Sequence, residues 1–213
     1  MSRKLRVHAI LHGTTVNGPG VRTAVWQAGC SIGCLGCWNP ETWDPAGGTA
    51  WSPQDLVEAV VRDATPRTQG LTLSGGEPFQ QAEAAAEFVR AVKALQPTWD
   101  VFVWTGYTLD DLVTKAQKEP AIQDLLRQID ILVDGPYKAA QRSPGKLWCG
   151  STNQRVLALT PRGQGLVLAA QTAWALGDHD EFEVQISPGG HVVVTGFPPR
   201  GIVRELNIGK AKT

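Results

Sequence analysis

Strand-like and helix-like segments alternate along the first two thirds of the chain, and this alternation constrains the fold more than any other feature. Short apolar segments at 5–11, 22–30, 70–76, 101–107 and 129–135 are rich in β-branched residues and end in glycine or polar residues. Amphipathic segments separate the last three of them. Such alternation predicts an α/β fold with a mostly parallel sheet covered by helices.

Helix-start signals support this interpretation. Ser52 precedes a proline, and together they predict a helix over about 53–63. Apolar residues at helical spacing predict a second helix up to about residue 95. Thr108 and Asp111 have the spacing of a capping box, and a further helical stretch ends near Leu126.

Residues able to carry chemistry follow the predicted strands directly. Cys30, the segment Gly75–Glu77, Thr105 and Asp134 each come at or just after a strand end. Ligands of parallel α/β sheets bind beyond the carboxyl ends of the strands. We therefore expect these residues to meet at one rim of the sheet and to form an active site.

The pattern changes toward the C-terminus. Segment 165–176 is ambiguous between helix and strand, and 181–197 alternates around Pro188 like a β-hairpin. We expect a core domain over 1–159 and a C-terminal extension over 160–213 with a small β-containing element.

Composition restricts the class of protein. The chain has 213 residues, 42% of them hydrophobic, and its 20 Lys and Arg balance 20 Asp and Glu. A globular protein without the basic footprint of a nucleic-acid binder is expected. No apolar segment of about 18 residues and no secretory signal stand out. These features predict a cytoplasmic protein without membrane contact, in which clustered cysteines indicate a metal or redox site rather than disulfides.

Three cysteines fall within the nine-residue segment CSIGCLGCW, at Cys30, Cys34 and Cys37. A structural zinc site needs four protein ligands, so here Cys149 or a histidine would have to complete it. Three thiolates on a 4Fe-4S cluster instead leave one iron open to a small molecule. The spacing favours the cluster, and the zinc site is the alternative.

A Cys-x3-Cys-x2-Cys pattern after a strand resembles the radical S-adenosylmethionine (SAM) superfamily, whose open iron chelates the amino and carboxylate groups of SAM. Segments 17–43, 71–79, 101–112, 129–137 and 147–156 resemble, in the same order, the glycyl radical activating enzymes, and most closely the activating proteins of anaerobic ribonucleoside-triphosphate reductase.

Two features depart from these patterns. Most superfamily members have an aromatic residue before the third cysteine, where this chain has Gly36. Here, as in the activating proteins of this reductase, the aromatic residue follows the cysteine, as Trp38. The tail beyond about residue 160 is the second departure, because the short activating proteins typically lack it.

The resemblance implies roles for the rim residues. Gly75, Gly76 and Glu77 would receive the methionine part of SAM, with the Glu77 carboxylate supporting the loop. Two glycines also permit close backbone approach of a ligand. Trp38 offers a flat face for adenine, although a simply buried tryptophan is the alternative.

Thr105 and Asp134 would contact the ribose or carboxylate of SAM, or the substrate peptide. Structural capping is the alternative for both, because Thr and Asp commonly cap the helix or turn after a strand.

The resemblance further implies a partial (βα)-barrel and a radical SAM oxidoreductase. A flavodoxin- or ferredoxin-type donor would reduce the cluster, SAM would be cleaved, and a glycyl radical would form on a partner enzyme, anaerobic ribonucleotide reductase. The alternatives are a radical SAM enzyme acting on another peptide or small molecule, and a non-catalytic zinc-binding module.

Overall fold

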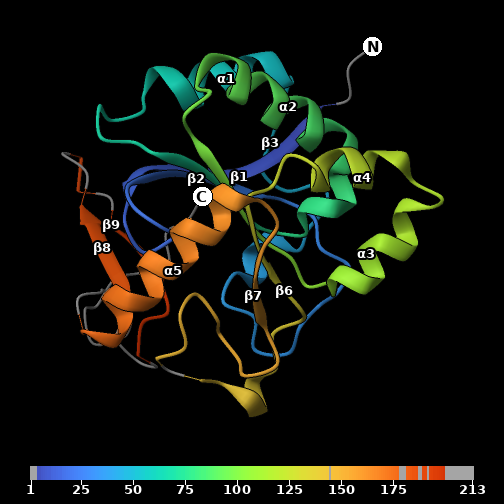
Figure 1. Cartoon of the computed structure of the whole chain (residues 1–213). Coiled ribbons are helices and arrows are strands. Elements are labelled where there is room, and N and C mark those ends of the chain that lie inside the picture. Colours follow the sequence, from blue (N-terminus) through green and yellow to red (C-terminus); the bar gives the residue numbers. More distant parts are fainter. Residues whose placement is uncertain (1–3, 144, 178–180, 187–188, 191, 200–213) are drawn as a thin grey trace.

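A seven-stranded sheet with the order β3-β1-β2-β4-β5-β6-β7 forms the centre of the computed structural model (Figure 1). The structure describes residues 4–143, 145–177, 181–186, 189–190 and 192–199. The strands of this sheet are β1 Leu5–Thr14, β2 Arg22–Gln27, β3 Thr49–Trp51, β4 Gly70–Gly75, β5 Asp100–Trp104, β6 Ile131–Asp134 and β7 Arg155–Ala158.

Four neighbouring strands of the sheet, β2, β4, β5 and β6, run parallel. Strand β1 pairs antiparallel with β2, while β3 and β7 are antiparallel strands at the two edges. The expected α/β class and mostly parallel sheet are confirmed. Strand β3 was not predicted, because three residues are too few to show an alternating pattern.

Helices begin where the sequence signals indicated. The Ser52 hydroxyl accepts the backbone N–H of Asp55 at the start of the first helix, and Thr108 and Asp111 form a complete capping box. Each satisfies N–H groups that have no partner inside the helix. The helices are α1 Pro53–Arg62, α2 Ala82–Leu95, α3 Leu109–Ala116, α4 Pro120–Leu126 and α5 Pro161–Ala175.

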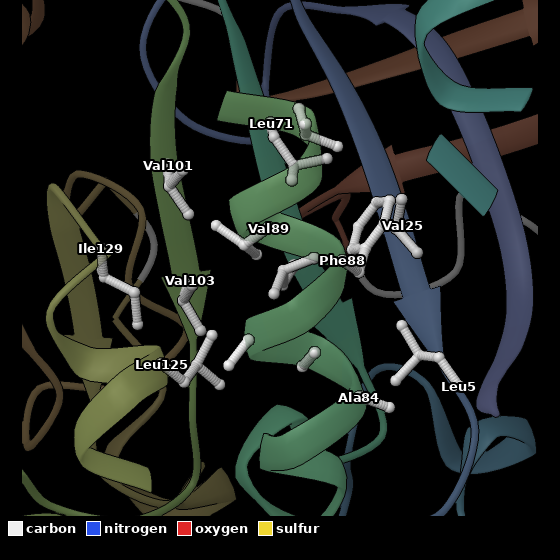
Figure 2. Packing of buried hydrophobic residues seen from close by; sticks show 14 of the residues in the cluster. Leu5, Val25, Leu71, Ala84, Phe88, Val89, Val101, Val103, Leu125 and Ile129 are labelled. Carbon is white, nitrogen blue, oxygen red and sulfur yellow. The ribbon is translucent and has the colours of Figure 1, made fainter. Parts of the chain in front are cut away.

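Successive side chains of β5 pack on opposite faces of the sheet, as strand geometry requires. Val101 and Val103 belong to the larger core cluster, where α2 contributes Phe88 and Val89. Figure 2 shows these side chains converging between the helix and the strands. Helices α1, α2 and α4 thus cover one face of the sheet, with α3 packed against α4.

The opposite face is covered by α5. Phe102 of β5 and Ile131 and Val133 of β6 form a second cluster, and Leu166 and Val167 of α5 pack against it. Segment 165–176, ambiguous by sequence, is therefore helical up to Ala175.

Strands β8 Phe182–Ile186 and β9 Val192–Gly196 form a separate antiparallel sheet. This finding confirms the predicted hairpin, whose expected turn residue Pro188 lies outside the described residues. In the described part of the chain, no helix combines the length and the apolar character that crossing a membrane requires.

Candidate functional site

The cysteine loop, residues 28–39, begins where β2 ends, and backbone hydrogen bonds tie its first residues to the following segment. The Gly29 N–H donates to the Thr42 carbonyl at 2.7 Å, and the Cys30 N–H donates to the Trp43 carbonyl at 3.1 Å. Cys30, Cys34 and Cys37 are each partly exposed. The loop therefore presents three accessible thiols at the rim of the parallel strands.

Backbone N–H groups surround the three sulfur atoms. Those of Ile32 and Gly33 hydrogen-bond to Cys30, and that of Tyr137 to Cys34. The Asn39 N–H donates to the Cys37 Sγ at 3.4 Å. Such donors stabilise thiolates, which are the form that binds metal.

Burial raises the pKa of Cys30 and of Cys34, and the negative charges of the neighbouring cysteines raise it further. Three mutually repelling thiolates need a cation to compensate them. In the described residues, no three His, Cys, Asp or Glu side chains are close enough to hold one metal ion. Three thiols on one loop offer the donor set that a cluster requires, in which each thiolate would bind a different iron.

Cys149 lies in a different environment. Its side chain is buried in the second core cluster, and its sulfur contacts the Gln154 carbonyl at 3.8 Å. Burial raises the pKa of this thiol to about 11, which keeps it protonated at neutral pH. The zinc alternative would need this thiol as a thiolate, or a histidine, as its fourth ligand.

The glycine pair after β4 packs directly against the start of the cysteine loop. The Gly76 and Glu77 N–H groups donate to the carbonyls of Gln27 and Gly29, both at 2.8 Å. A Cβ at Gly75 would lie 2.6 Å from the Gln27 oxygen, and one at Gly76 would lie 2.4 Å from the Gly29 oxygen. Only glycine fits this approach, which joins the GGEP segment (Gly75–Pro78) to the cysteine loop.

Glu77 is buried, and its carboxylate joins two strand ends. It accepts hydrogen bonds from the Thr105 hydroxyl, the Gly106 N–H and the Phe79 N–H at 2.8, 2.8 and 3.1 Å. Burial raises its pKa to about 7, although these hydrogen bonds oppose the shift. These three hydrogen bonds are how the Glu77 carboxylate can support the loop, as the sequence analysis expected.

Thr105 and Asp134 lie at the predicted strand ends, and both side chains have protein partners. The Thr105 hydroxyl binds Glu77 and also accepts the Tyr107 N–H. Asp134 accepts the N–H of Leu109, at the start of α3, and pairs with Arg155. These contacts are those of capping residues, and contact of either residue with SAM stays a prediction.

Two glutamines that the sequence analysis did not consider tie the site together. The Gln80 side chain accepts the Ser31 N–H at 3.0 Å and donates to the Tyr107 hydroxyl at 3.1 Å. Gln81 donates to the Ala28 carbonyl at 2.9 Å. The segment after GGEP is therefore bonded to the loops after β2 and β5.

Trp38 is half-buried, and its ring has three side-chain neighbours. Its ring centroid lies 6.1 Å from that of Phe197 and 6.5 Å from that of Tyr137. The Arg142 guanidinium lies 4.8 Å from the ring. These contacts leave part of the ring exposed, and the stacking of adenine on Trp38 stays a prediction.

Three side chains near the end of the matching segment 147–156 bond to the backbone directly after β6. The sequence alone assigned no role to them. The Ser151 hydroxyl accepts the Lys138 N–H at 3.2 Å. The side-chain amides of Asn153 and Gln154 donate to the carbonyls of Pro136 and Gly135 at 2.8 and 3.0 Å. Their partners are backbone atoms, so residue types alone gave no signal for this role.

A family model described as "4Fe-4S single cluster domain" matches residues 16–157, which include every rim residue discussed above. The site and the sheet thus define an iron–sulfur protein with one cluster.

Similar proteins show to which family of iron–sulfur proteins the chain belongs. Anaerobic ribonucleoside-triphosphate reductase-activating proteins of Vibrio cholerae and Escherichia coli K12 are 38% and 37% identical over 149 and 145 residues. These matches cover 68% and 66% of this chain and 92% and 90% of the relatives. The Haemophilus influenzae protein is 37% identical over 65% of this chain and 88% of its own length. The chain belongs to the family of anaerobic ribonucleoside-triphosphate reductase-activating proteins.

Proposed function

We propose that this protein is a radical SAM enzyme that generates a glycyl radical on an anaerobic ribonucleoside-triphosphate reductase. The observation that carries the proposal is the junction between Gly76 and Gly29, which places the GGEP segment directly against the loop of three cysteines. The family of the chain supplies the partner.

Cys30, Cys34 and Cys37 would hold a 4Fe-4S cluster. When bound and reduced, the cluster supplies the electron that cleaves SAM. The glycine pair brings backbone polar groups close to the ligand, and Glu77 keeps this segment fixed to the end of β5. The remaining task of the protein is to admit one glycine of the partner and to exclude water.

Finer features belong to the same proposal. The four parallel strands of the sheet would form the partial barrel of the superfamily, with Trp38, Thr105 and Asp134 as further SAM neighbours. A flavodoxin- or ferredoxin-type protein would deliver the electron. An enzyme of this kind works in a reducing, oxygen-free cytoplasm.

The test is anaerobic reconstitution with iron and sulfide, followed by reduction and addition of SAM. We expect about four iron atoms per chain, from the composition of the cluster, and formation of 5'-deoxyadenosine. On addition of the reductase, an organic radical should appear on that partner in its electron paramagnetic resonance (EPR) spectrum. Bound zinc without 5'-deoxyadenosine would disprove the proposal.

Two variants separate the alternatives. Cys34→Ser should lose the iron chromophore and SAM cleavage, because one cluster ligand is removed. Cys149→Ser is the matched control and should retain both, whereas a zinc site completed by Cys149 would lose its metal. SAM cleavage without a radical on the reductase would favour another peptide or small molecule as substrate.

A further inference from the structure

We propose that the described part of the C-terminal extension, which lies between residues 160 and 199, orders the cysteine loop, with Phe197 and Thr195 as its positioning residues. The family model ends at residue 157, so the described contacts of residues 160–199 lie outside the matched region. The contacts themselves do not depend on the proposed function, but the benefit of an ordered cysteine loop for cluster binding rests on it.

The hairpin of the extension is anchored on the segment between β1 and β2. The buried Asn17 side chain donates to the Thr195 hydroxyl at 3.0 Å. The Glu183 carboxylate accepts the Thr15 N–H at 3.0 Å and lies 3.2 Å from the Thr15 hydroxyl. Asn17 begins segment 17–43, so the hairpin bonds to one of the segments that resemble the activating enzymes.

Phe197, directly after β9, connects the anchored hairpin to the cysteine loop through a contact with Trp38. Its ring meets Trp38 edge-on, at an interplanar angle of 77°. Arg142 donates to the Pro198 carbonyl at 3.1 Å while its guanidinium lies over the Trp38 ring. The residue next to the cluster ligand Cys37 is thus held between the core and the extension.

A third segment completes the connection. Tyr137 donates its N–H to the Cys34 sulfur and lies beside Trp38. A Cβ at Gly150 would lie 3.0 Å from the Tyr137 ring and 3.2 Å from the Phe197 ring. Gly150 therefore lies close to both rings, and Tyr137 in turn lies beside Trp38. Loss of Phe197 would remove a ring contact from Trp38 and leave space beside Gly150.

The helix of the extension fixes its other end to the sheet. The Thr160 hydroxyl donates to Asp130 at 2.6 Å, and a Cβ at Gly163 would lie 2.1 Å from the Asp130 carbonyl oxygen. Trp174 donates its indole N–H to the Gly145 carbonyl at 2.9 Å. Because the extension is attached to Asp130 and Gly145 and also contacts Trp38, it limits the motion of the cysteine loop.

Hydrogen–deuterium exchange of the iron-free, reduced full chain tests the inference without any cluster. The peptide spanning residues 28–43 contains the bonded N–H groups of Gly29, Cys30 and Cys37. Phe197→Ala should make this peptide exchange about two- to ten-fold faster, the range expected for loss of an aromatic pair. Thr195→Val should act in the same direction, and Phe197→Tyr should restore slow exchange.

Ile186→Ala is the matched control, because Ile186 belongs to the same hairpin and is 71% exposed. It should leave exchange in residues 28–43 unchanged. The peptide of buried β4 serves as the internal reference for global unfolding. If Phe197→Ala also speeds exchange in the β4 peptide, this variant is globally destabilised. Thr195→Val is then the variant compared with the wild-type chain. Unchanged exchange at the cysteine loop in the folded variants overturns the inference.

A second measurement uses the loaded enzyme. Phe197→Ala should alter the EPR change that SAM causes in the reduced cluster, and Phe197→Tyr should restore it. If both the EPR change and exchange are unaffected while activation of the reductase falls, the extension is a docking surface for the partner and the inference is wrong. Failure of the wild-type chain to cleave SAM would instead contradict the proposed function.

Discussion

The Thr105 hydroxyl donates a hydrogen bond to Glu77 Oε1 at 2.8 Å, and the next backbone N–H, that of Gly106, donates to Oε2 at the same distance. Glu77 follows β4 and Thr105 follows β5, so one buried carboxylate joins the ends of two parallel strands. Since Glu77 is also bonded through its own N–H to Gly29, the same residue reaches the cysteine loop.

Glu77 should make the stability of the iron-free protein depend on pH. Its pKa is raised from 4.5 to about 7 in the folded chain. Between these values the folded chain binds more protons than the unfolded chain, so the free energy of unfolding falls as pH rises, by about 3 kcal/mol from this group. Urea unfolding at pH 5 and pH 8 measures the change. Glu77→Gln should remove this part of it, and an equal pH dependence in the variant would contradict the assignment.

Gly76→Ala should disrupt the junction of the two loops. Its Cβ would lie 2.4 Å from the Gly29 carbonyl oxygen, so the backbone must move, at a cost of about 1–3 kcal/mol. We expect loss of SAM cleavage, assayed as 5'-deoxyadenosine formed by the reconstituted enzyme. Gly165→Ala in α5 is the control, because no atom lies within 4 Å of its added Cβ. It should retain full activity and gain up to about 1 kcal/mol of stability.

Arg22 and Asp100 form a buried ion pair, with Arg22 Nη2 and Asp100 Oδ1 2.8 Å apart. Arg22 also donates to the Thr72 hydroxyl at 2.7 Å, so its role is structural. Arg22→Met should lower the free energy of unfolding by about 3–5 kcal/mol, because the Asp100 charge stays buried and unpaired. Denaturant titration measures this loss. Arg62→Ala, which breaks an exposed pair with Asp63, should have little effect, and equal losses would refute the distinction.

The four cysteines should differ in reactivity. In the native, iron-free protein, iodoacetamide should modify Cys30, Cys34 and Cys37, which are partly exposed. Cys149 should resist, because its thiol is buried and its pKa of about 11 keeps it protonated. Peptide mass spectrometry identifies the modified residues, and the same treatment in urea should modify all four. Rapid native modification of Cys149 would contradict its buried placement.

Most of the sheet and its helices could be predicted because periodicity and capping are local signals. Ser52 and Thr108 indicate the helices that begin directly after them, and strands β5 and β6 are apolar except for one aspartate each. Helix α5 could not be distinguished from a strand, since most of its length is small or apolar residues without a clear polar face.

The site was predictable as a set of residue types but not as a set of contacts. The spacing of the three cysteines and the position of the glycine pair after a strand can be recognised in the sequence alone. The ring contact of Trp38 depends on Phe197, far away in sequence, and the role of Gln154 depends on a backbone carbonyl of Gly135. No local pattern encodes such partners.

The order of strands in the sheet has a consequence for synthesis. From β2 outward, the strands β4, β5, β6 and β7 add in the order in which they occur in the chain. A nascent chain emerging from the ribosome can therefore extend the sheet one strand at a time, each new strand meeting a neighbour already in place. The cysteine loop emerges early, but its supports after β4, β6 and β9 arrive later. Folding would thus complete the surroundings of the cysteine loop last, once the residues of β9 have left the ribosome.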